Sequence, residues 1–360
     1  MPLFKSNSLE GWVNANCAPE TWSIKDGVVF CTGKPTGAIR TARQYENFIV
    51  EIEWRHLSSG GNSGIFLWGT AIAAPGVPFL RGIEVQVLDH GFNAKGKNEW
   101  YTTHGDVFPI HGATMSPFGR HNGQRSFPSE ERSKGSPEWN HYRIHCNNGV
   151  LRLSVNGKEV SGGEKCVYRK GYLALESEGA PIEFRNARIK ELPSTGAPES
   201  ESAPFDIGFR TAFTGLDLRG WKTNEATAAR WQVRGERLLL KEGTPAPGAT
   251  LWIDKPFLDS EFIVDCRPAK PREGEPPLVP AVLIKTSRGS SHELKLAGAT
   301  AEKYTRFVIS IQNREIQVKL DDKPVGRAQL PEDPAAPRTF GLADTGGSVE
   351  FMNVYFRELK

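Results

Sequence analysis

One strand-like segment in the first half of the chain carries two carboxylates that could carry out acid–base chemistry and an amide that could bind a substrate. Glu84, Gln86 and Asp89 lie in segment 82–89, where polar and apolar residues alternate. Because successive side chains of a strand point to opposite faces, Glu84 and Gln86 share one face. Carboxylates from neighbouring strands can approach within the ~5–10 Å that acid–base cleavage of glycosidic bonds requires. Segment 82–89 is therefore a candidate catalytic strand.

Other polar residues could complete such a site. Glu53 and Arg55 share one face of segment 49–55, and Glu53 could form a carboxylate pair with Glu84. Asn62, which follows Gly60-Gly61, could supply an amide, and so could Asn140. An ordinary solvated sheet surface is the alternative interpretation of each of these residues.

Segment 90–137 has the composition of a functional loop. It holds four of the eight histidines, His104 among them, and the aromatic residues Trp100 and Tyr101. Flat apolar rings and polar tips are what a sugar site uses. A structural hydrogen bond is the alternative for each histidine, and no H-x-x-x-H spacing indicates a metal site.

The chain repeats one unit twice. Gly11-Trp12 recurs as Gly220-Trp221, an offset of 209, whereas Trp139 matches Tyr304 at an offset of 165. The drop in offset gives the first copy about 44 extra residues, which are the loop just described. We predict a first domain at 1–192, a Pro- and Ser-rich linker at 193–204 and a second domain at 205–360.

The second copy serves as an internal control. It keeps a carboxylate, Glu293, at the Glu84 position, but it lacks the loop. The same alignment replaces three other polar residues: Arg267 stands for Glu53, Lys295 for Gln86 and Thr305 for Asn140. Polar groups that are lost while apolar partners persist are not needed for folding, so we expect the site in copy one and a non-catalytic copy two.

Alternating segments predict the architecture that positions these residues. Segments 49–55, 83–88 and 151–155 have the two-residue period of strands, and Asn156-Gly157 is typical of a tight hairpin turn. With 37 Gly and 25 Pro in 360 residues, many turns are expected. The sequence therefore predicts an all-β fold of antiparallel sandwiches.

Charge and hydropathy exclude some partners. Lys plus Arg is 45 and Asp plus Glu is 42, a net charge of +3, which disfavours nucleic-acid binding through bulk charge. No apolar run reaches the ~18 residues of a membrane span. The N-terminal residues lack the pattern of a signal peptide, so we expect a cytoplasmic protein, or a periplasmic or secreted one if a signal peptide has been removed.

Residues 4–192 resemble the 3-keto-disaccharide hydrolase domain family, formerly domain of unknown function 1080. The resemblance rests on Leu9-Glu10-Gly11-Trp12, Trp22-Ser23-Ile24-Lys25-Asp26-Gly27-Val28, Asn47–Arg55, Gly61-Asn62-Ser63-Gly64-Ile65-Phe66, Gly82–Asp89, Glu138-Trp139-Asn140 and Phe184-Arg185-Asn186. It implies two concanavalin A-like jelly-roll sandwiches in tandem, the second divergent. Trp68 stands where an Arg is common in the family and Glu176 where a Gln is common, and both are expected to touch the groove.

The resemblance implies hydrolysis of glycosides already oxidised at C3. A C3 ketone acidifies the C2 hydrogen, so we expect Glu84 as base and His104 or Asp89 as acid. Arg55 or Asn62 would stabilise the enolate, and the remaining predicted contacts to the sugar are Gln86, Asn140, Trp68, Trp100, Tyr101 and Glu176. No required cofactor is expected; a divalent metal such as Ca²⁺ is left open, as is the oligomeric state. Two alternatives are a glycosidase with Glu84 and Glu53 as its carboxylate pair, and a carbohydrate-binding protein without catalysis.

Overall fold

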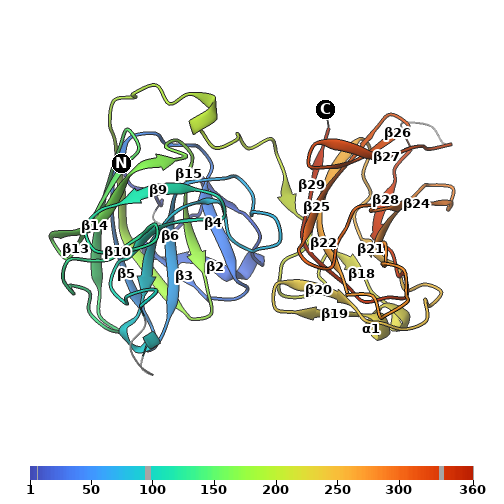
Figure 1. The fold of residues 1–360 in the computed structure, drawn as a ribbon, viewed down its shortest axis with the longest axis horizontal. Coiled ribbons are helices and arrows are strands. Elements are labelled where there is room, and N and C mark those ends of the chain that lie inside the picture. Colours follow the sequence, from blue (N-terminus) through green and yellow to red (C-terminus); the bar gives the residue numbers. More distant parts are fainter. Residues whose placement is uncertain (6, 94–98, 332–335, 360) are drawn as a thin grey trace. The chain divides into compact units, whose positions relative to one another are not determined.

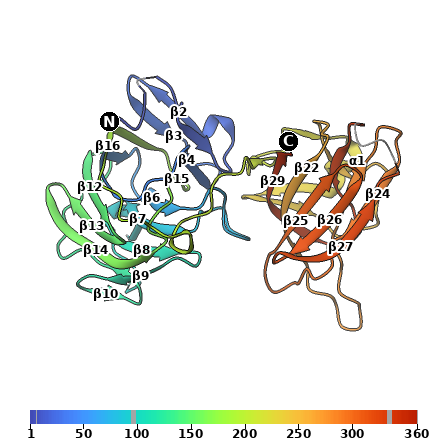
Figure 2. The same cartoon turned by 90° about the horizontal axis from the view of Figure 1, so that it is seen from above.

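The computed structural model describes residues 1–5, 7–93, 99–331 and 336–359, which form two compact units (Figure 1). The first unit comprises Met1–Ala74 and Pro78–Asp206, and the second comprises Ile207–Lys360 with Pro75–Val77. Both units are antiparallel jelly-roll sandwiches, which confirms the predicted all-β fold. Figure 2 shows β12, β13 and β14 side by side in the first unit and β25, β26 and β27 side by side in the second.

One sheet of the first unit carries Glu84 and is called the site sheet below. Its described strands lie in the order β1 (Trp12–Asn14), β4 (Gly37–Thr41), β15 (Tyr172–Ser177), β6 (Asn62–Gly69), β7 (Gly82–Leu88), β8 (Val107–Ile110), β11 (Arg125–Ser126) and β10 (His121–Asn122). Strands β8, β10 and β11 belong to the long loop, so this loop extends the sheet beside β7.

The opposite sheet is called the back sheet. Its described strands lie in the order β2 (Trp22–Lys25), β3 (Val28–Cys31), β16 (Ile182–Glu191), β5 (Phe48–His56), β12 (Asn140–Asn147), β13 (Val150–Val155), β14 (Lys158–Val167) and β9 (Thr114–Pro117). Along β5, buried and half-buried residues alternate in the way that a strand with one solvated face requires.

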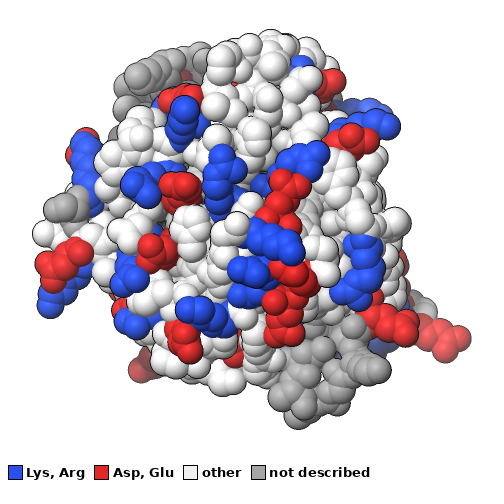
Figure 3. Space-filling model, turned by 90° about the vertical axis from the view of Figure 1, so that its left-hand side faces the viewer, with Lys and Arg blue, Asp and Glu red and all other residues white. Residues whose placement is uncertain are grey.

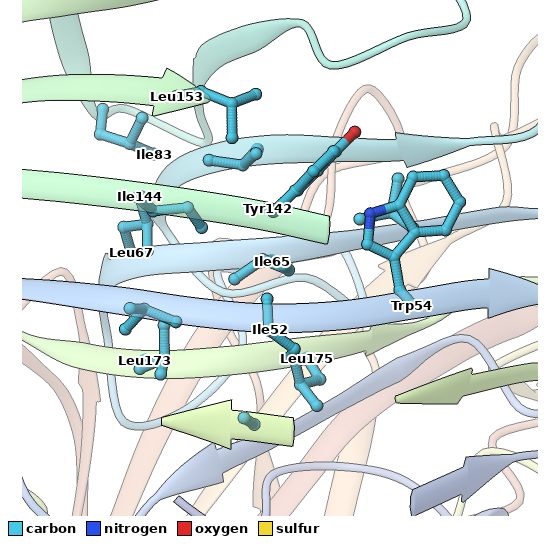
Figure 4. Close-up of a cluster of buried hydrophobic side chains, with 14 of the residues drawn as sticks. Ile52, Trp54, Ile65, Leu67, Ile83, Tyr142, Ile144, Leu153, Leu173 and Leu175 are labelled. Atoms are coloured by element: carbon cyan, nitrogen blue, oxygen red, sulfur yellow. The ribbon is translucent and has the colours of Figure 1, made fainter. Parts of the chain in front are cut away.

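The core of the first unit forms where the inward faces of the two sheets meet. Ile52 and Tyr142 of the back sheet face Ile65 and Leu175 of the site sheet, and all four are almost completely buried (Figure 4). Trp54 meets Tyr142 edge to face, with ring centroids 5.3 Å apart. This packing fixes which side chains of β6, β7 and β15 must point away from the core.

The second unit repeats the strand order of the first. Its larger sheet runs β19 (Trp231–Arg234), β20 (Arg237–Leu240), β29 (Val349–Glu358), β22 (Ser260–Pro268), β25 (Thr305–Gln312), β26 (Glu315–Leu320) and β27 (Lys323–Gln329), with β17 (Arg210–Thr211) beside β29. Its smaller sheet runs β18 (Trp221–Lys222), β21 (Leu251–Ile253), β28 (Thr339–Leu342), β23 (Ala281–Lys285) and β24 (Ser291–Lys295). The site sheet's extension through β8, β10 and β11 has no counterpart among the described strands of this unit.

Strand register corrects one detail of the copy alignment. Trp54 lies opposite Asn140, and Cys266 lies opposite Thr305. Since Asn140 matches Thr305, Glu53 matches Asp265 and not Arg267, whereas Arg55 matches Arg267. The sequence alignment was therefore wrong by two residues along this strand.

The corrected alignment shows that Arg55 belongs to a network present in both copies. The guanidinium of Arg55 lies 2.8 Å from the Glu183 carboxylate and stacks on Trp139, 4.6 Å from the ring centroid. In the second unit Arg267 lies 2.6 Å from Glu350 and 4.8 Å from the Tyr304 ring centroid. Both copies keep this network, on the back sheet of the first unit and on the equivalent sheet of the second, so it is a feature of the fold.

Helices are short. They are the 3-10 turns η1 (Pro19–Thr21), η2 (His90–Asn93) and η3 (Glu199–Glu201) and the single α-helix α1 (Glu225–Arg230) of the described chain. The Asn224 side chain caps α1 by accepting a hydrogen bond from the Thr227 backbone N–H. Among the described residues no helix is long and apolar enough to cross a membrane.

Charges of both signs are interspersed on the face of the molecule shown in Figure 3. Several of the charged residues of the first unit pair with opposite charges, as Arg152 does with Glu159 at 2.6 Å and Arg188 with Glu51 at 3.3 Å. This distribution does not indicate the single-sign surface that nucleic-acid binding by bulk charge would need.

Asn140 anchors the end of the long loop and gives a test of the fold. Its Oδ1 accepts a hydrogen bond of 2.7 Å from the Lys134 N–H, and its Nδ2 donates one of 2.9 Å to the Lys134 carbonyl. Replacing Asn140 with Ala leaves these backbone groups without that partner, so we expect the free energy of unfolding to fall by about 1–3 kcal/mol in urea titrations.

The matched control is Thr305, the Asn140 equivalent in the second unit. Its hydroxyl has no hydrogen-bond partner within the described part of the chain. A Thr305→Val substitution should therefore leave the stability unchanged or raise it slightly. Equal losses in the two variants would contradict the anchoring role of Asn140.

Candidate active site

Two glutamate side chains meet over a glycine on the outward face of the site sheet. Val85 and Leu175 point into the core, so Glu84 on β7 and Glu176 on β15 point away from it. Gly64 on β6 lies between them. A Cβ atom at Gly64 would lie 2.8 Å from Glu84 Oε1 and 3.0 Å from Glu176 Oε2, so these two oxygens are no more than about 6 Å apart. The missing side chain makes room for both carboxyl groups.

Burial raises the pKa of both carboxyl groups. Glu84 is 7% exposed and Glu176 is 2% exposed. Burial raises the pKa of Glu84 to about 8; the charges of Glu178 and Asp106 act in the same direction, and Arg125 opposes them. Burial, followed by the charges of Glu84 and Glu178, raises the pKa of Glu176 well above its usual range. The pair can therefore deliver a proton, and a carboxylate formed there would be a strong base.

A chain of hydrogen bonds crosses the sheet beside this pair. Arg125 Nε donates to Asp106 at 2.6 Å, and Arg125 Nη2 donates to Gln86 Oε1 at 2.8 Å. Gln86 Nε2 donates to Asn62 Oδ1 at 2.8 Å, and Asn62 Nδ2 donates to a Glu178 carboxylate oxygen. The chain connects the long loop to β7, β6 and the end of β15, and it places one cation close to the two glutamates.

Aromatic rings of the long loop surround that cation. The Arg125 guanidinium lies 3.7 Å from the ring centroid of Phe108 and 5.9 Å from that of Tyr101. Thr102 donates its backbone N–H to Asp106 at 2.8 Å, which holds the acidic partner of Arg125 in place. Residues 94–98 of the loop lie outside the described residues. The loop thus supplies the site with an arginine, its counter-ion and two ring faces.

Comparison with known families identifies the first unit. Residues 1–190 match the family described as the 3-keto-alpha-glucoside-1,2-lyase-like domain. The chain belongs to this family.

Solved structures with similar domains were also found. A crystal structure from Parabacteroides distasonis ATCC 8503 named "Putative glycosyl hydrolase" has 25% identity and a TM-score of 0.40, and the match covers 53% of this chain and 98% of that one. The carbohydrate-binding module CBM66 from Bacillus subtilis has 13% identity and a TM-score of 0.37, with 50% and 96% covered. Comparison with curated proteins gives no match.

Asp89 lies directly after β7, the candidate catalytic strand, but its carboxylate binds backbone N–H groups. Its carboxylate accepts hydrogen bonds from the N–H groups of Gly60 at 2.7 Å, Gly91 at 2.8 Å and Ser136 at 2.6 Å. Burial opposes its ionisation, but the three N–H donors outweigh burial and lower the pKa of Asp89. A carboxylate held in this way is a poor acid for a leaving group.

His104 lies on the long loop and is half-buried. Burial lowers its pKa, and its Nδ1 has no hydrogen-bond partner among the described residues. The negative charge of Asp106 acts to raise the pKa of both the His104 imidazole and the Glu84 carboxyl group. The structure does not join His104 to Glu84 by a hydrogen bond, so its role as an acid stays a prediction.

Four predicted residues lie away from the glutamate pair of the lyase-like domain, and the structure corrects their placement. Glu53 and Arg55 are on the outward face of the back sheet, on the other side of the core, where Glu53 pairs with Arg185 at 2.7 Å. Trp68 is fully buried. Asn140 holds the loop backbone, as described above.

Trp68 shows why strand alternation failed at that position. Alternation from Gly64 and Phe66 predicts an outward side chain, but the β6–β15 register shifts near Trp68, whose φ is 53°. This bulge turns the indole into the core, where it packs on Phe48 and donates its N–H to the Glu46 carbonyl at 2.8 Å. The Arg that the family often carries here is therefore replaced by a core residue.

The structure brings together the remaining predicted residues and adds others. Glu84, Gln86, Asn62, Glu176 and Tyr101 surround one region, whereas Trp100 is 74% exposed at the loop surface. The residues that the sequence analysis did not assign to the site are Gly64, Asp106, Arg125 and Glu178.

The copy comparison could have identified Gly64. Ile65 lies opposite Leu175 in the first unit, as Val282 lies opposite Leu342 in the second. Strand register therefore matches Ile65 with Val282 and Leu175 with Leu342. Gly64 then matches Ala281, and Glu176 matches Ala343. The second unit keeps Glu293 but fills the glycine space with a methyl group and lacks the second carboxyl.

The described residues contain no group of three or more His, Cys, Asp or Glu side chains arranged to hold a metal ion. The nearest arrangement is the Glu84–Glu176 pair, and burial raises the pKa of both carboxyl groups. Nothing in this geometry assigns ligands to Ca²⁺, so the predicted divalent metal receives no residues.

The raised pKa of Glu84 predicts a pH-dependent stability. Between pH 4.5, its usual pKa, and pH about 8, the folded protein keeps the proton that the unfolded chain releases. The folded state then binds more protons, so its stability falls with rising pH, by about 1 kcal/mol per pH unit. The contribution is complete below pH 4.5 and is lost as the pH passes about 8.

Urea titrations across this pH range check the prediction. The Glu84→Gln variant lacks the ionisable group, so its stability relative to the unaltered protein should rise with pH. Glu293→Gln, at the matched exposed position of the second unit, should leave the slope unchanged. Parallel pH dependences of the unaltered protein and the Glu84→Gln variant would contradict the assignment.

Proposed function

We propose that the first unit cleaves glycosides that carry a ketone at C3, by removing the proton at C2. The observation that carries this proposal is the buried Glu84–Glu176 pair over Gly64. Membership in the 3-keto-alpha-glucoside-1,2-lyase-like family supports the substrate class.

The reaction needs a base that acts at C2 of the sugar and an acid that acts on the oxygen at C1. Glu84, in its carboxylate form, takes the C2 proton, and the electron pair of the C–H bond forms a C1=C2 double bond through the enolate. The C1–O bond breaks, and Glu176 gives its proton to the leaving oxygen. The products are an unsaturated 3-keto sugar and the released alcohol, and adding water across the double bond would complete a hydrolysis.

The chain of hydrogen bonds beside the glutamate pair can stabilise the negative charge that develops on the substrate. Negative charge moves onto the C3 oxygen in the enolate, and Arg125 supplies a fixed positive charge close to Glu84. Asn62 keeps the role of amide donor that the sequence analysis gave it, and Arg125 takes the role given there to Arg55. Because C3 is already oxidised in the substrate, these steps need no electron acceptor.

Turnover of 3-keto-trehalose and of unoxidised trehalose tests the proposal. Glu84→Gln and Glu176→Gln keep the volume of each side chain but remove its acid–base function, so each should lower kcat on the 3-keto substrate by about 10²–10⁴-fold. Activity of the unaltered protein should rise as the pH approaches about 8, where Glu84 ionises.

The matched control is Glu293→Gln, which makes the same change at the equivalent position of the second unit and should leave kcat unchanged. Retention of full turnover by Glu84→Gln would refute its role as base. Trehalose cleavage at a rate equal to that of the 3-keto sugar would instead favour a glycosidase in which Glu84 and Glu176, close enough for such a mechanism, form the carboxylate pair. Binding of both sugars without any product would leave a carbohydrate-binding protein.

A further inference from the structure

The second unit contains a cavity of about 970 Å³ over its smaller sheet. Segments 242–245, 269–279 and 345–348 form its walls, and Ala281, Glu293 and Lys295 form its floor. This volume is at the upper end of the range of cavities that hold small ligands.

The cavity lies where the first unit has its glutamate pair. Ala281 matches Gly64, Glu293 matches Glu84 and Lys295 matches Gln86 by strand register. Glu293 and Lys295 are both exposed and share one face of β24, while Leu294 between them is buried. The second unit therefore has an open, ligand-sized space at this position, and the residues around it differ from those of the first unit.

The substitutions remove the proton-carrying pair. Ala343 stands where the first unit has Glu176, and the Ala281 methyl group occupies the space that Gly64 leaves open. A single exposed Glu293 has no second carboxyl to share a proton with. The cavity can bind a ligand, but it lacks the acid–base pair proposed for the first unit.

A buried ion pair holds the walls in position. Asp344 accepts a hydrogen bond of 2.8 Å from Arg230 Nε and others from the backbone N–H groups of Gly346 and Ala246. Gly243 N–H donates to the Gly346 carbonyl at 2.8 Å, which joins two of the three wall segments. These contacts show that the walls are organised by the protein itself.

The charged residues that line the cavity balance in sign, with three cations and three carboxylates, but not all of them form ion pairs. Arg272 pairs with Glu242 at 2.5 Å and lies 3.8 Å from Glu275. Lys270, Lys295 and Glu293 form no ion pair with any residue that the structure describes. Two ammonium groups and one carboxylate therefore remain available to a ligand, together with the aliphatic surface of Leu278 and Val279.

From this arrangement we propose that the cavity is a second, non-catalytic saccharide site that prefers a sugar bearing a carboxylate, such as a uronate. The proposal rests on the proposed function in one respect, namely that this face of the repeated fold holds a sugar. The ammonium group of Lys295 replaces the Gln86 amide and can pair with the sugar carboxylate, while Glu293 accepts hydrogen bonds from hydroxyl groups.

Isothermal titration of the full-length protein with cellobiouronic acid and with cellobiose tests this inference. The two disaccharides differ in one carboxylate, so the acid should bind about 5- to 10-fold more tightly at low salt. Lys295→Gln restores the amide of the first unit and should abolish this preference. Lys285→Gln makes the same change on the neighbouring strand β23, outside the cavity lining, and should preserve it.

Equal affinity for the two disaccharides, absence of binding, or an equal loss in the Lys285→Gln variant would overturn the proposal. An equally strong response to inorganic phosphate would also overturn it, because the cavity would then bind any anion. Turnover of 3-keto-trehalose, measured on the same protein, reports on the first unit alone. Loss of that activity with an intact preference for the acid would count against the proposed function and not against this site.

Discussion

Two carboxyl groups that are buried side by side cannot both carry a negative charge without a large cost in free energy, because the low dielectric of the interior neither solvates nor screens them. The Glu84–Glu176 pair is subject to this constraint, and the rest of the site follows from it. Gly64 provides the space that lets both groups approach. The sandwich core fixes which face of β6, β7 and β15 must carry them, since the alternate positions fill the interior. The result is a pair of carboxyl groups with raised pKa values, at a position where the surrounding charges are also fixed.

The difference between the two units shows which parts the fold needs and which it does not. Both units keep the strand order, and both keep the network that is Arg55–Glu183 on the back sheet of the first unit and Arg267–Glu350 on the equivalent sheet of the second. Only the first unit, among the described residues, combines a glycine, two carboxyl groups and a loop that delivers an arginine. The loop places Arg125 and its counter-ion Asp106 beside Glu84, and the pKa of Glu84 depends on both charges.

Sequence periodicity predicted the strands because alternation is a local property of the chain, and recurring motifs such as Gly11-Trp12 and Gly220-Trp221 predicted the two copies. It also placed Glu84 and Gln86 on a common outward face, where the structure has them. Periodicity carries no information about which sheet a strand joins, and for that reason Glu53 was paired with Glu84 although the core lies between them. Trp68 departs from alternation because of a bulge that only the β6–β15 pairing produces. Arg125 and Asp106 lie in a loop without periodicity, so their positions depend on tertiary contacts alone.

In the proposed reaction the glutamate pair removes a proton from C2 of a 3-keto sugar. This step is tested most directly with 3-keto-trehalose that carries deuterium at C2 of its oxidised ring, in single-turnover experiments on the unaltered protein. If Glu84 takes that hydrogen in the slow step, the labelled substrate must react more slowly and the deuterium must leave the sugar for solvent. Equal rates for the two substrates, with the label retained at C2 in the product, would contradict the proposed reaction and leave direct cleavage at C1 as the chemistry of this site.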